Sequence, residues 1–173
     1  GGITNGGTLP LTNSTISGNT STTTEGGGGI LNTWGTATIV SSTIGPNNRT
    51  SAGAGGGICN PFGGMVAVSN STIAKNTAAS HGGGIYNANG SMVLLTNSTV
   101  AGNTTTGGNG GGVWNDDGFS TFVPGSSILA YNEAGAGSGL DVKGTAESLG
   151  CNLIKDAVGG DGFTQTGDQA DQL

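Results

Sequence analysis

A short motif of two glycines, an apolar residue and, two positions later, an asparagine recurs along this chain and limits its possible folds. The clearest copy runs from Gly83 to Asn87 and reads GGIYN. Its apolar residue returns every 27 or 28 residues, at Ile3, Ile30, Ile58, Ile85, Val113 and Leu140. So constant a period is typical of a solenoid, in which each repeat adds one unit to a stack.

A second motif has the same period and is clearest at residues 97–103, NSTVAGN. Its apolar positions are Ile16, Ile44, Ile73, Val100 and Leu129. A short apolar run, such as residues 92–95, lies between the two motifs in most repeats. Each unit therefore holds three strand-like pieces. The pattern predicts an all-β fold, a right-handed parallel β-helix of about six coils with 27–28 residues and three strands per coil.

The repeats divide the chain into successive coils. We place them at residues 1–25, 26–53, 54–81, 82–109, 110–136 and 137–155. The β-helix is thus predicted to span residues 1–155. Residues 156–173 are expected to form a C-terminal extension that runs across or off the last coil.

The recurring glycines and asparagines have a structural interpretation. Glycines before each apolar anchor permit a corner with positive φ and close backbone approach. Asparagines at equivalent positions of successive coils can hydrogen-bond from coil to coil. We predict two such ladders. The first comprises Asn5, Asn32, Asn60, Asn87 and Asn115; the second comprises Asn19, Asn47, Asn76, Asn103 and Asn132.

Composition excludes several functions. The formal charge is −6, with only four Lys and Arg residues, so no basic stripe is available to bind nucleic acid. No apolar run approaches the roughly 20 residues of a membrane-spanning helix, so membrane insertion is not expected. Cys59 and Cys151 lie in distant coils, which predicts two free thiols. His81 is the single histidine, and we expect no cofactor and no metal site.

The end of the repeat region resembles a known group of proteins. Residues 140–142 (LDV), followed by residues 148–154 (SLGCNLI), are similar to bacterial right-handed β-helix proteins that often carry a CSLREA element or a choice-of-anchor module. The two repeat motifs are also similar to theirs. This resemblance implies a secreted or surface-attached protein with a fold like that of pectate lyases.

Carboxylates are the first candidate for chemistry, because the resemblance to pectate lyases implies a Ca²⁺-binding carboxylate cluster with a cationic base. The best local group is Asp116 and Asp117 with Asp141 in the next coil. No cation occupies a matching position, and turn-forming carboxylates are the favoured interpretation. Whether the protein is an enzyme stays open, and a non-enzymatic role is favoured.

Two columns of side chains could form binding surfaces. Leu31, Cys59, Tyr86 and Trp114 each follow an anchor and should point outward, with Trp34 and Phe62 nearby. Such residues can stack on sugar rings or contact another protein, unless a loop or neighbouring subunit covers them, which is the favoured alternative. The other column is Thr15, Thr43, Thr72 and Thr99. Regular threonines are compatible with ice binding, although β-propensity on a solvated strand explains them more simply.

These features favour a non-enzymatic extracellular module with a structural or adhesive role. It could associate with other copies of itself, end to end or laterally. The alternative is a protein that binds or cleaves extracellular polysaccharide. Ice binding through the threonine column is a more remote alternative.

Overall fold

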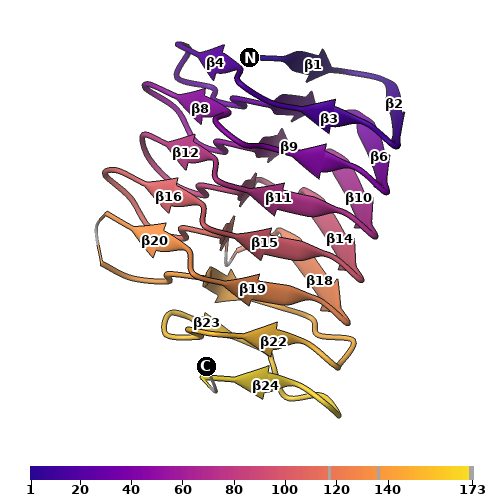
Figure 1. Cartoon of the computed structure of the whole chain (residues 1–173), viewed down its shortest axis with the longest axis vertical. Helices are drawn as coiled ribbons and strands as arrows, with labels where there is room; N and C mark the ends of the chain where they lie inside the picture. The colour runs from indigo at the N-terminus through magenta and orange to yellow at the C-terminus, as the bar shows by residue number, and fades with distance from the viewer. Residues whose placement is uncertain (117, 136, 172–173) are drawn as a thin grey trace.

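The computed structural model describes residues 1–116, 118–135 and 137–171, and in that range the chain is a right-handed parallel β-solenoid without helices (Figure 1). The predicted fold class is therefore confirmed. Each complete turn contains four strands, not three, and successive turns build four parallel sheets, which we name A to D in chain order.

The strands of each sheet follow one another at the repeat interval. Sheet A contains β1 (Ile3–Asn5), β5 (Ile30–Thr33), β9 (Ile58–Phe62), β13 (Ile85–Asn87), β17 (Val113–Asn115), β21 (Val142–Thr145) and β23 (Gly160–Asp161). Sheet B contains β2 (Thr8–Thr12), β6 (Thr36–Val40), β10 (Met65–Ser69), β14 (Met92–Thr96) and β18 (Thr121–Gly125). Sheet C contains β3 (Thr15–Ile16), β7 (Thr43–Ile44), β11 (Thr72–Ala74), β15 (Thr99–Ala101), β19 (Ile128–Ala130), β22 (Leu153–Ile154) and β24 (Gln169–Ala170). Sheet D contains β4 (Thr20–Ser21), β8 (Arg49–Thr50), β12 (Thr77–Ala78), β16 (Thr104–Thr105) and β20 (Glu133–Ala134).

Sheet D contains the fourth strand of each turn, which the sequence did not predict. Its strands have only two residues, and its inward positions are small or polar: Ser21, Thr50, Ala78 and Thr105. The Thr50 and Thr105 hydroxyls donate hydrogen bonds to the carbonyl oxygens of Gly53 and Gly108. Because its strands are so short and their inward residues are not large apolar ones, sheet D produces no alternating apolar pattern in the sequence.

The interior is a stack of identical positions. Ile30, Ile58 and Ile85 pair in register along sheet A and are fully buried. Burying each such side chain contributes roughly 1.5–3 kcal/mol. In the sixth coil the prediction of Leu140 as the anchor is wrong, because Val142 pairs with Val113 and occupies the buried position. The step from Val113 to Val142 is longer than the regular repeat and hides this register.

The glycines before each anchor have the two predicted roles. Gly55 has a φ of 65°. A Cβ at Gly56 would lie 2.5 Å from the Gly83 carbonyl oxygen, and one at Gly57 would lie 2.7 Å from that of Gly84. Only glycine allows the coils to approach this closely at the corner.

Both asparagine ladders exist, and in both each side-chain amide donates to the Oδ1 atom of the next coil. The first runs through Asn5, Asn32, Asn60, Asn87 and Asn115, with N···O distances of 2.7–3.0 Å. The second runs through Asn19, Asn48, Asn76, Asn103 and Asn132, with distances of 2.9–3.0 Å. The prediction of Asn47 is wrong because this coil has one more residue between its anchor and the ladder. Asn47 is exposed, with a φ of 65°, and Asn48 is buried.

A third ladder lies at the turn between sheets B and C. The backbone N–H of each serine donates to the hydroxyl of the serine in the next coil, and each hydroxyl donates to the carbonyl two residues before it. Its serines are Ser14, Ser42, Ser71, Ser98 and Ser127, with N···O distances of 3.0–3.2 Å between coils. Asn152 and then Asp168 accept the last two backbone bonds.

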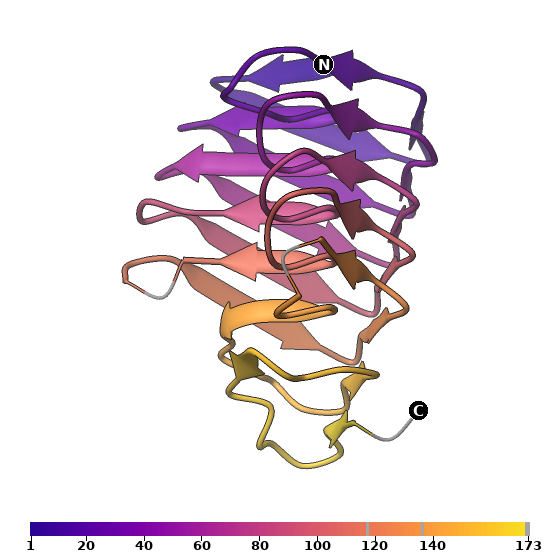
Figure 2. The ribbon, with the colours of Figure 1, turned by 90° about the vertical axis from the view of Figure 1, so that its left-hand side faces the viewer.

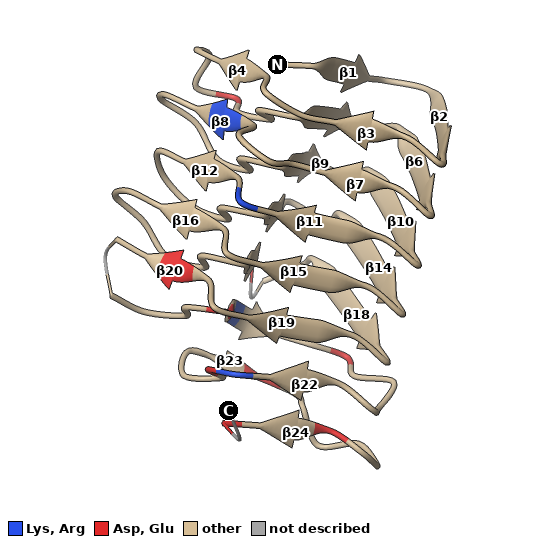
Figure 3. Ribbon diagram, in the orientation of Figure 1, with Lys and Arg blue, Asp and Glu red and all other residues tan. Residues whose placement is uncertain are grey.

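Sheets B and D have five strands each, so there are five complete turns, and sheets A and C continue for two more strands. β23 and β24 extend the stack beyond residue 155 (Figure 2). The strands of sheets B and C contain no charged residue. Acidic residues gather in the C-terminal turns instead (Figure 3).

Candidate functional site

The outer face of sheet A carries aromatic side chains on two neighbouring strands. Tyr86 in β13 pairs with Trp114 in β17, and their rings stack with centroids 4.8 Å apart and planes 4° apart. The His81 ring also stacks on Trp114, at 5.3 Å and 28°. The Trp114 ring therefore contacts two rings of the protein itself, Tyr86 and His81. The face of the Tyr86 ring opposite Trp114 points toward the preceding coil.

The other two members of this column, Leu31 and Cys59, lie on the same outer face but are covered. Their exposed fractions are 8% and 0%. The loop that precedes β5 covers Cys59, whose thiol donates a hydrogen bond to the Glu25 carbonyl oxygen at 3.1 Å. Burial raises the pKa of the Cys59 thiol to about 12. Leu31 and Cys59 are thus buried beneath a loop, as the favoured alternative for this column predicted. Tyr86 and Trp114 are half-buried.

Trp34 and Phe62 form an exposed pair at the turns between sheets A and B. Their ring centroids lie 5.9 Å apart, and their exposed fractions are 63% and 40%. Trp34 has a φ of 65°, and the residue at its register position in the next coil is Gly63, with a φ of 63°. The turn requires a conformation suited to glycine, so a tryptophan here is strained.

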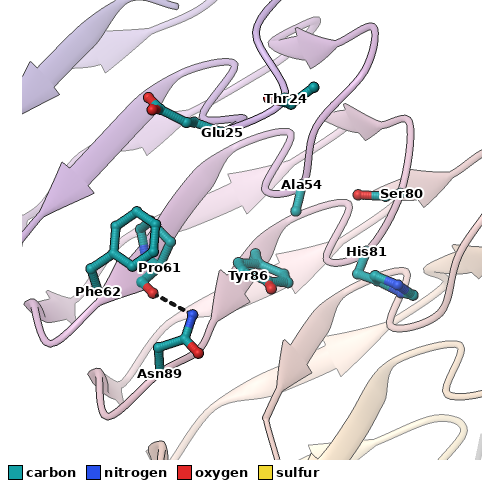
Figure 4. Close-up of a pocket in the computed structure, with 9 residues that line it drawn as sticks. All are labelled: Thr24, Glu25, Ala54, Pro61, Phe62, Ser80, His81, Tyr86 and Asn89. Atoms are coloured by element: carbon teal, nitrogen blue, oxygen red, sulfur yellow. Dashed lines mark hydrogen bonds between the residues drawn. The ribbon is translucent and has the colours of Figure 1, made fainter.

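Two adjoining hollows lie beside these rings. One, of about 360 Å³, is lined by Trp34, Phe62, Gly63 and Asn89. The other, of about 200 Å³, is lined by Thr24, Glu25, Ala54, Pro61, Phe62, Ser80, His81, Tyr86 and Asn89 (Figure 4). Phe62 and Asn89 belong to both, so the hollows form one groove across sheet A.

Polar groups of the groove are held in place by the fold. The Asn89 side-chain amide donates to the Pro61 carbonyl oxygen at 2.9 Å. His81 Nδ1 accepts the backbone N–H of Asn109 at 3.1 Å, which leaves the proton of the neutral ring on Nε2. Burial raises the pKa of the Tyr86 phenol, and the nearby Cys59 and Asp116 add to the shift. Tyr86 therefore stays a neutral hydrogen-bonding group at neutral pH.

The predicted carboxylate group does not converge. Asp116 follows the end of β17, whereas Asp141 precedes the start of β21. The register of Val113 with Val142 places the two four positions apart along the strands, about 13 Å. Asp117 lies outside the described residues. Within the described ranges, no three His, Cys, Asp or Glu side chains form a group that could hold a metal ion.

Asp141 has a structural position instead. Its Oδ1 accepts the backbone N–H and the side-chain amide of Asn132 at 3.0 and 2.7 Å, and its Oδ2 accepts the backbone N–H of Asp156 at 2.8 Å. It is the last acceptor of the second asparagine ladder. Burial raises the pKa of the Asp141 carboxyl, and these hydrogen bonds partly offset the shift.

The threonines of the second candidate surface do form a column. Thr15, Thr43, Thr72 and Thr99 pair in register on sheet C, and Ile128 takes the next position. The column thus has four regularly spaced hydroxyl-bearing side chains. Thr15 is exposed and the other three are half-buried.

Sequence reasoning identified Trp34, Phe62 and Tyr86 but not the rest of the groove. Glu25, Pro61 and Asn89 come from three coils: Glu25 and Asn89 lie in loops, and Pro61 lies near the end of β9, outside the repeat motif. Only the winding of the chain brings them together.

None of the described segments is a helix long and apolar enough to cross a membrane. No protein-family model, curated protein or solved structure matches this chain.

Proposed function

We propose that this chain is a non-enzymatic extracellular module with a structural and adhesive role, and that its adhesive surface binds carbohydrate in the groove on sheet A. Three hydrogen-bonded ladders support the structural part, because they hold successive coils at a fixed spacing. The extracellular location is proposed from the resemblance to bacterial β-helix surface proteins with CSLREA or choice-of-anchor segments.

The observation that carries the adhesive part is the conformation of Trp34. An exposed aromatic ring in a left-handed turn costs roughly 1–3 kcal/mol of strain, which glycine would avoid. Strain of this kind gathers at binding sites, where the side chain has a use that the fold does not provide. Exposed aromatic faces next to amides and hydroxyls suit sugar rings, which have apolar faces and polar edges.

Binding is favoured over lyase activity because the carboxylates suggested for catalysis do not meet. Asp116 and Asp141 lie at opposite ends of neighbouring strands, and Asp141 is fully hydrogen-bonded within the protein. Self-association is a second role that we propose, and lateral contact through sheet B is the favoured form. Met65 and Met92 are partly exposed there, on a face without charged strand residues.

The substitution Trp34→Gly tests carbohydrate binding apart from stability. We expect the variant to retain or raise its unfolding midpoint, because glycine relieves the turn, and to lose at least about tenfold in affinity for a polysaccharide that the wild type retains. Pull-down on cellulose, chitin, chitosan and pectin measures the binding.

The matched control is Tyr131→Gly. Tyr131 is also an exposed aromatic residue with positive φ, at 67% exposure and 59°, but it lies beyond sheet C beneath Lys155. This variant should bind like the wild type. The proposal of carbohydrate binding is wrong if none of the four polysaccharides retains the protein, or if both variants lose binding equally.

A further inference from the structure

We infer that the groove on sheet A is selective for charge: it takes a short run of neutral or amino sugar rings and rejects acidic sugars such as uronates. This inference rests on the proposed carbohydrate binding and specifies its ligand. It is opposite to the acidic polysaccharides that a pectate-lyase-like fold would suggest.

The shape of the groove indicates a ligand of at least two rings. The hollow beside Trp34 and the hollow beside Tyr86 adjoin at Phe62 and Asn89. A chain of sugars that fills both must cross these two residues along the strand direction of sheet A. Each hollow then offers an aromatic side chain to one ring. Trp34 lines the first hollow, and Tyr86 lines the second (Figure 4).

The charge of the groove is one-sided. Among the described residues, Glu25 is the only one with a fixed charge that lines the groove, and no described Lys or Arg lines either hollow. A carboxylate on the ligand would have no cation among these residues to pair with and would be repelled by Glu25, whereas an ammonium group would be attracted by it.

The polar side chains of the groove supply neutral hydrogen-bonding groups. Ser80 and Thr24 offer hydroxyls, Asn89 an anchored amide, and His81 the protonated Nε2 of its neutral ring. These groups match the hydroxyl edges of a neutral sugar without supplying a positive charge. Selectivity therefore depends mainly on Glu25, which the exposed loop before β5 carries beside the groove.

Calorimetric titration with three trisaccharides tests the inference: a glucosamine trimer, a cellotriose and a galacturonate trimer. We expect the glucosamine trimer to bind at least as tightly as cellotriose. The galacturonate trimer should bind at least about tenfold more weakly than cellotriose. Glu25→Lys should reverse the order of the two charged ligands. Glu147→Lys, an equal change of charge at an exposed site outside the groove, should leave the order unchanged.

The outcomes separate the two proposals. If all three trisaccharides bind equally, or if galacturonate binds best, charge selectivity is wrong while carbohydrate binding stands. If Glu147→Lys changes the order as much as Glu25→Lys does, the net charge of the molecule and not the groove decides, and the inference falls. If no trisaccharide binds to the wild type, the inference about the ligand of the groove is wrong, and the retention of the protein on the four polysaccharides decides separately whether carbohydrate binding stands.

Discussion

At the scale of single residues, Asp141 shows why one position departs from the repeat. Its backbone bond to Val113 and the register of β21 place it where earlier coils have the glycine before the anchor. A Cβ at the equivalent Gly112 would lie 2.8 Å from the Asn132 amide nitrogen. No further asparagine follows Asn132 in the ladder. A carboxylate at position 141 lies close enough to accept the hydrogen bonds of Asn132 with one oxygen and that of the Asp156 N–H with the other.

We expect Asp141→Ala to destabilise the protein by about 1–3 kcal/mol, because it leaves the buried backbone N–H of Asn132 without its acceptor. The Asn132 side-chain amide loses one acceptor but keeps the carbonyl oxygens of Val100 and Ala130. Asp141→Asn should fall between this variant and the wild type, because its one oxygen serves Asn132 while its amide faces the Asp156 N–H. Urea unfolding measures the effect. Asp161→Ala, at an exposed site, should be near neutral, and equal stability of all variants would contradict the role of Asp141.

Asp168 gives a pH dependence. Burial raises the pKa of the Asp168 carboxyl, but hydrogen bonds from Ser148, Asn152 and Gln165 outweigh it and hold the pKa below its ordinary value. The unfolded chain therefore binds the proton first as the pH falls. The stability that Asp168 contributes is complete above about pH 4–5 and is lost as the pH falls toward its lowered value.

Comparison of wild type and Asp168→Asn by chemical unfolding from pH 6 to pH 2 should show a shallower loss of stability in the variant. Asp161→Asn should keep the wild-type slope. Parallel curves for wild type and Asp168→Asn would show that Asp168 does not titrate with folding.

At the scale of elements, the serine ladder fixes the turn between sheets B and C. In the middle of the ladder each hydroxyl accepts a bond from the preceding coil and donates one to its own coil. Ser71 Oγ, for example, accepts the backbone N–H of Ser42 and donates to the Ser69 carbonyl oxygen. The serine thus stabilises the turn and also joins neighbouring turns. The sequence shows serine at this point of every NST-like motif, but which group it pairs with depends on the stacking of coils.

Ser71→Ala should cost about 1–3 kcal/mol, because it leaves the buried N–H of Ser42 without its acceptor. Ser69→Ala removes a hydroxyl from a half-buried outward position of the neighbouring strand and should change the unfolding free energy by less than about 0.5 kcal/mol. Thermal or urea unfolding of the two variants separates these values. A small effect at both positions would contradict the structural role of the ladder.

At the scale of the whole molecule, each coil contacts only its neighbours, so stability is built from interfaces between adjacent coils. Coils in the middle have two interfaces, and their anchors are fully buried. The first coil has one, and its anchors Ile3 and Ile16 are only partly buried. Protection against exchange of backbone amides should therefore fall from the centre toward both ends.

Hydrogen–deuterium exchange with mass spectrometry measures this gradient. Peptides from residues 58–105 should exchange more slowly than peptides from residues 1–16 and 153–171. The comparison is internal, because the same hydrogen-bond pattern recurs in every coil. Uniform protection along the chain would indicate a single cooperative unit and contradict coil-by-coil stability.

The solenoid could be predicted from the repeat period alone. The interval between Ile30, Ile58 and Ile85 predicted that they would be vertical neighbours, and they are. The first asparagine ladder and the roles of the corner glycines followed from the same periodicity. A repeat encodes such features locally, because in a solenoid the residue above each position is the residue one period away.

The features that depart from the period depend on how the coils stack and could not be predicted in this way. The two-residue strands of sheet D have small or polar inward positions, so they show no apolar period in the sequence. The exchange of Asn47 for Asn48 and of Leu140 for Val142, and the position of Asp141, depend on insertions that change the register. The groove depends on loops of unequal sequence, which bring Glu25 and Asn89 to the same face as Phe62 at the end of β9. Periodicity specifies the neighbours along the axis, but the covering of the outer face is set by how non-repeating loops pack across several coils.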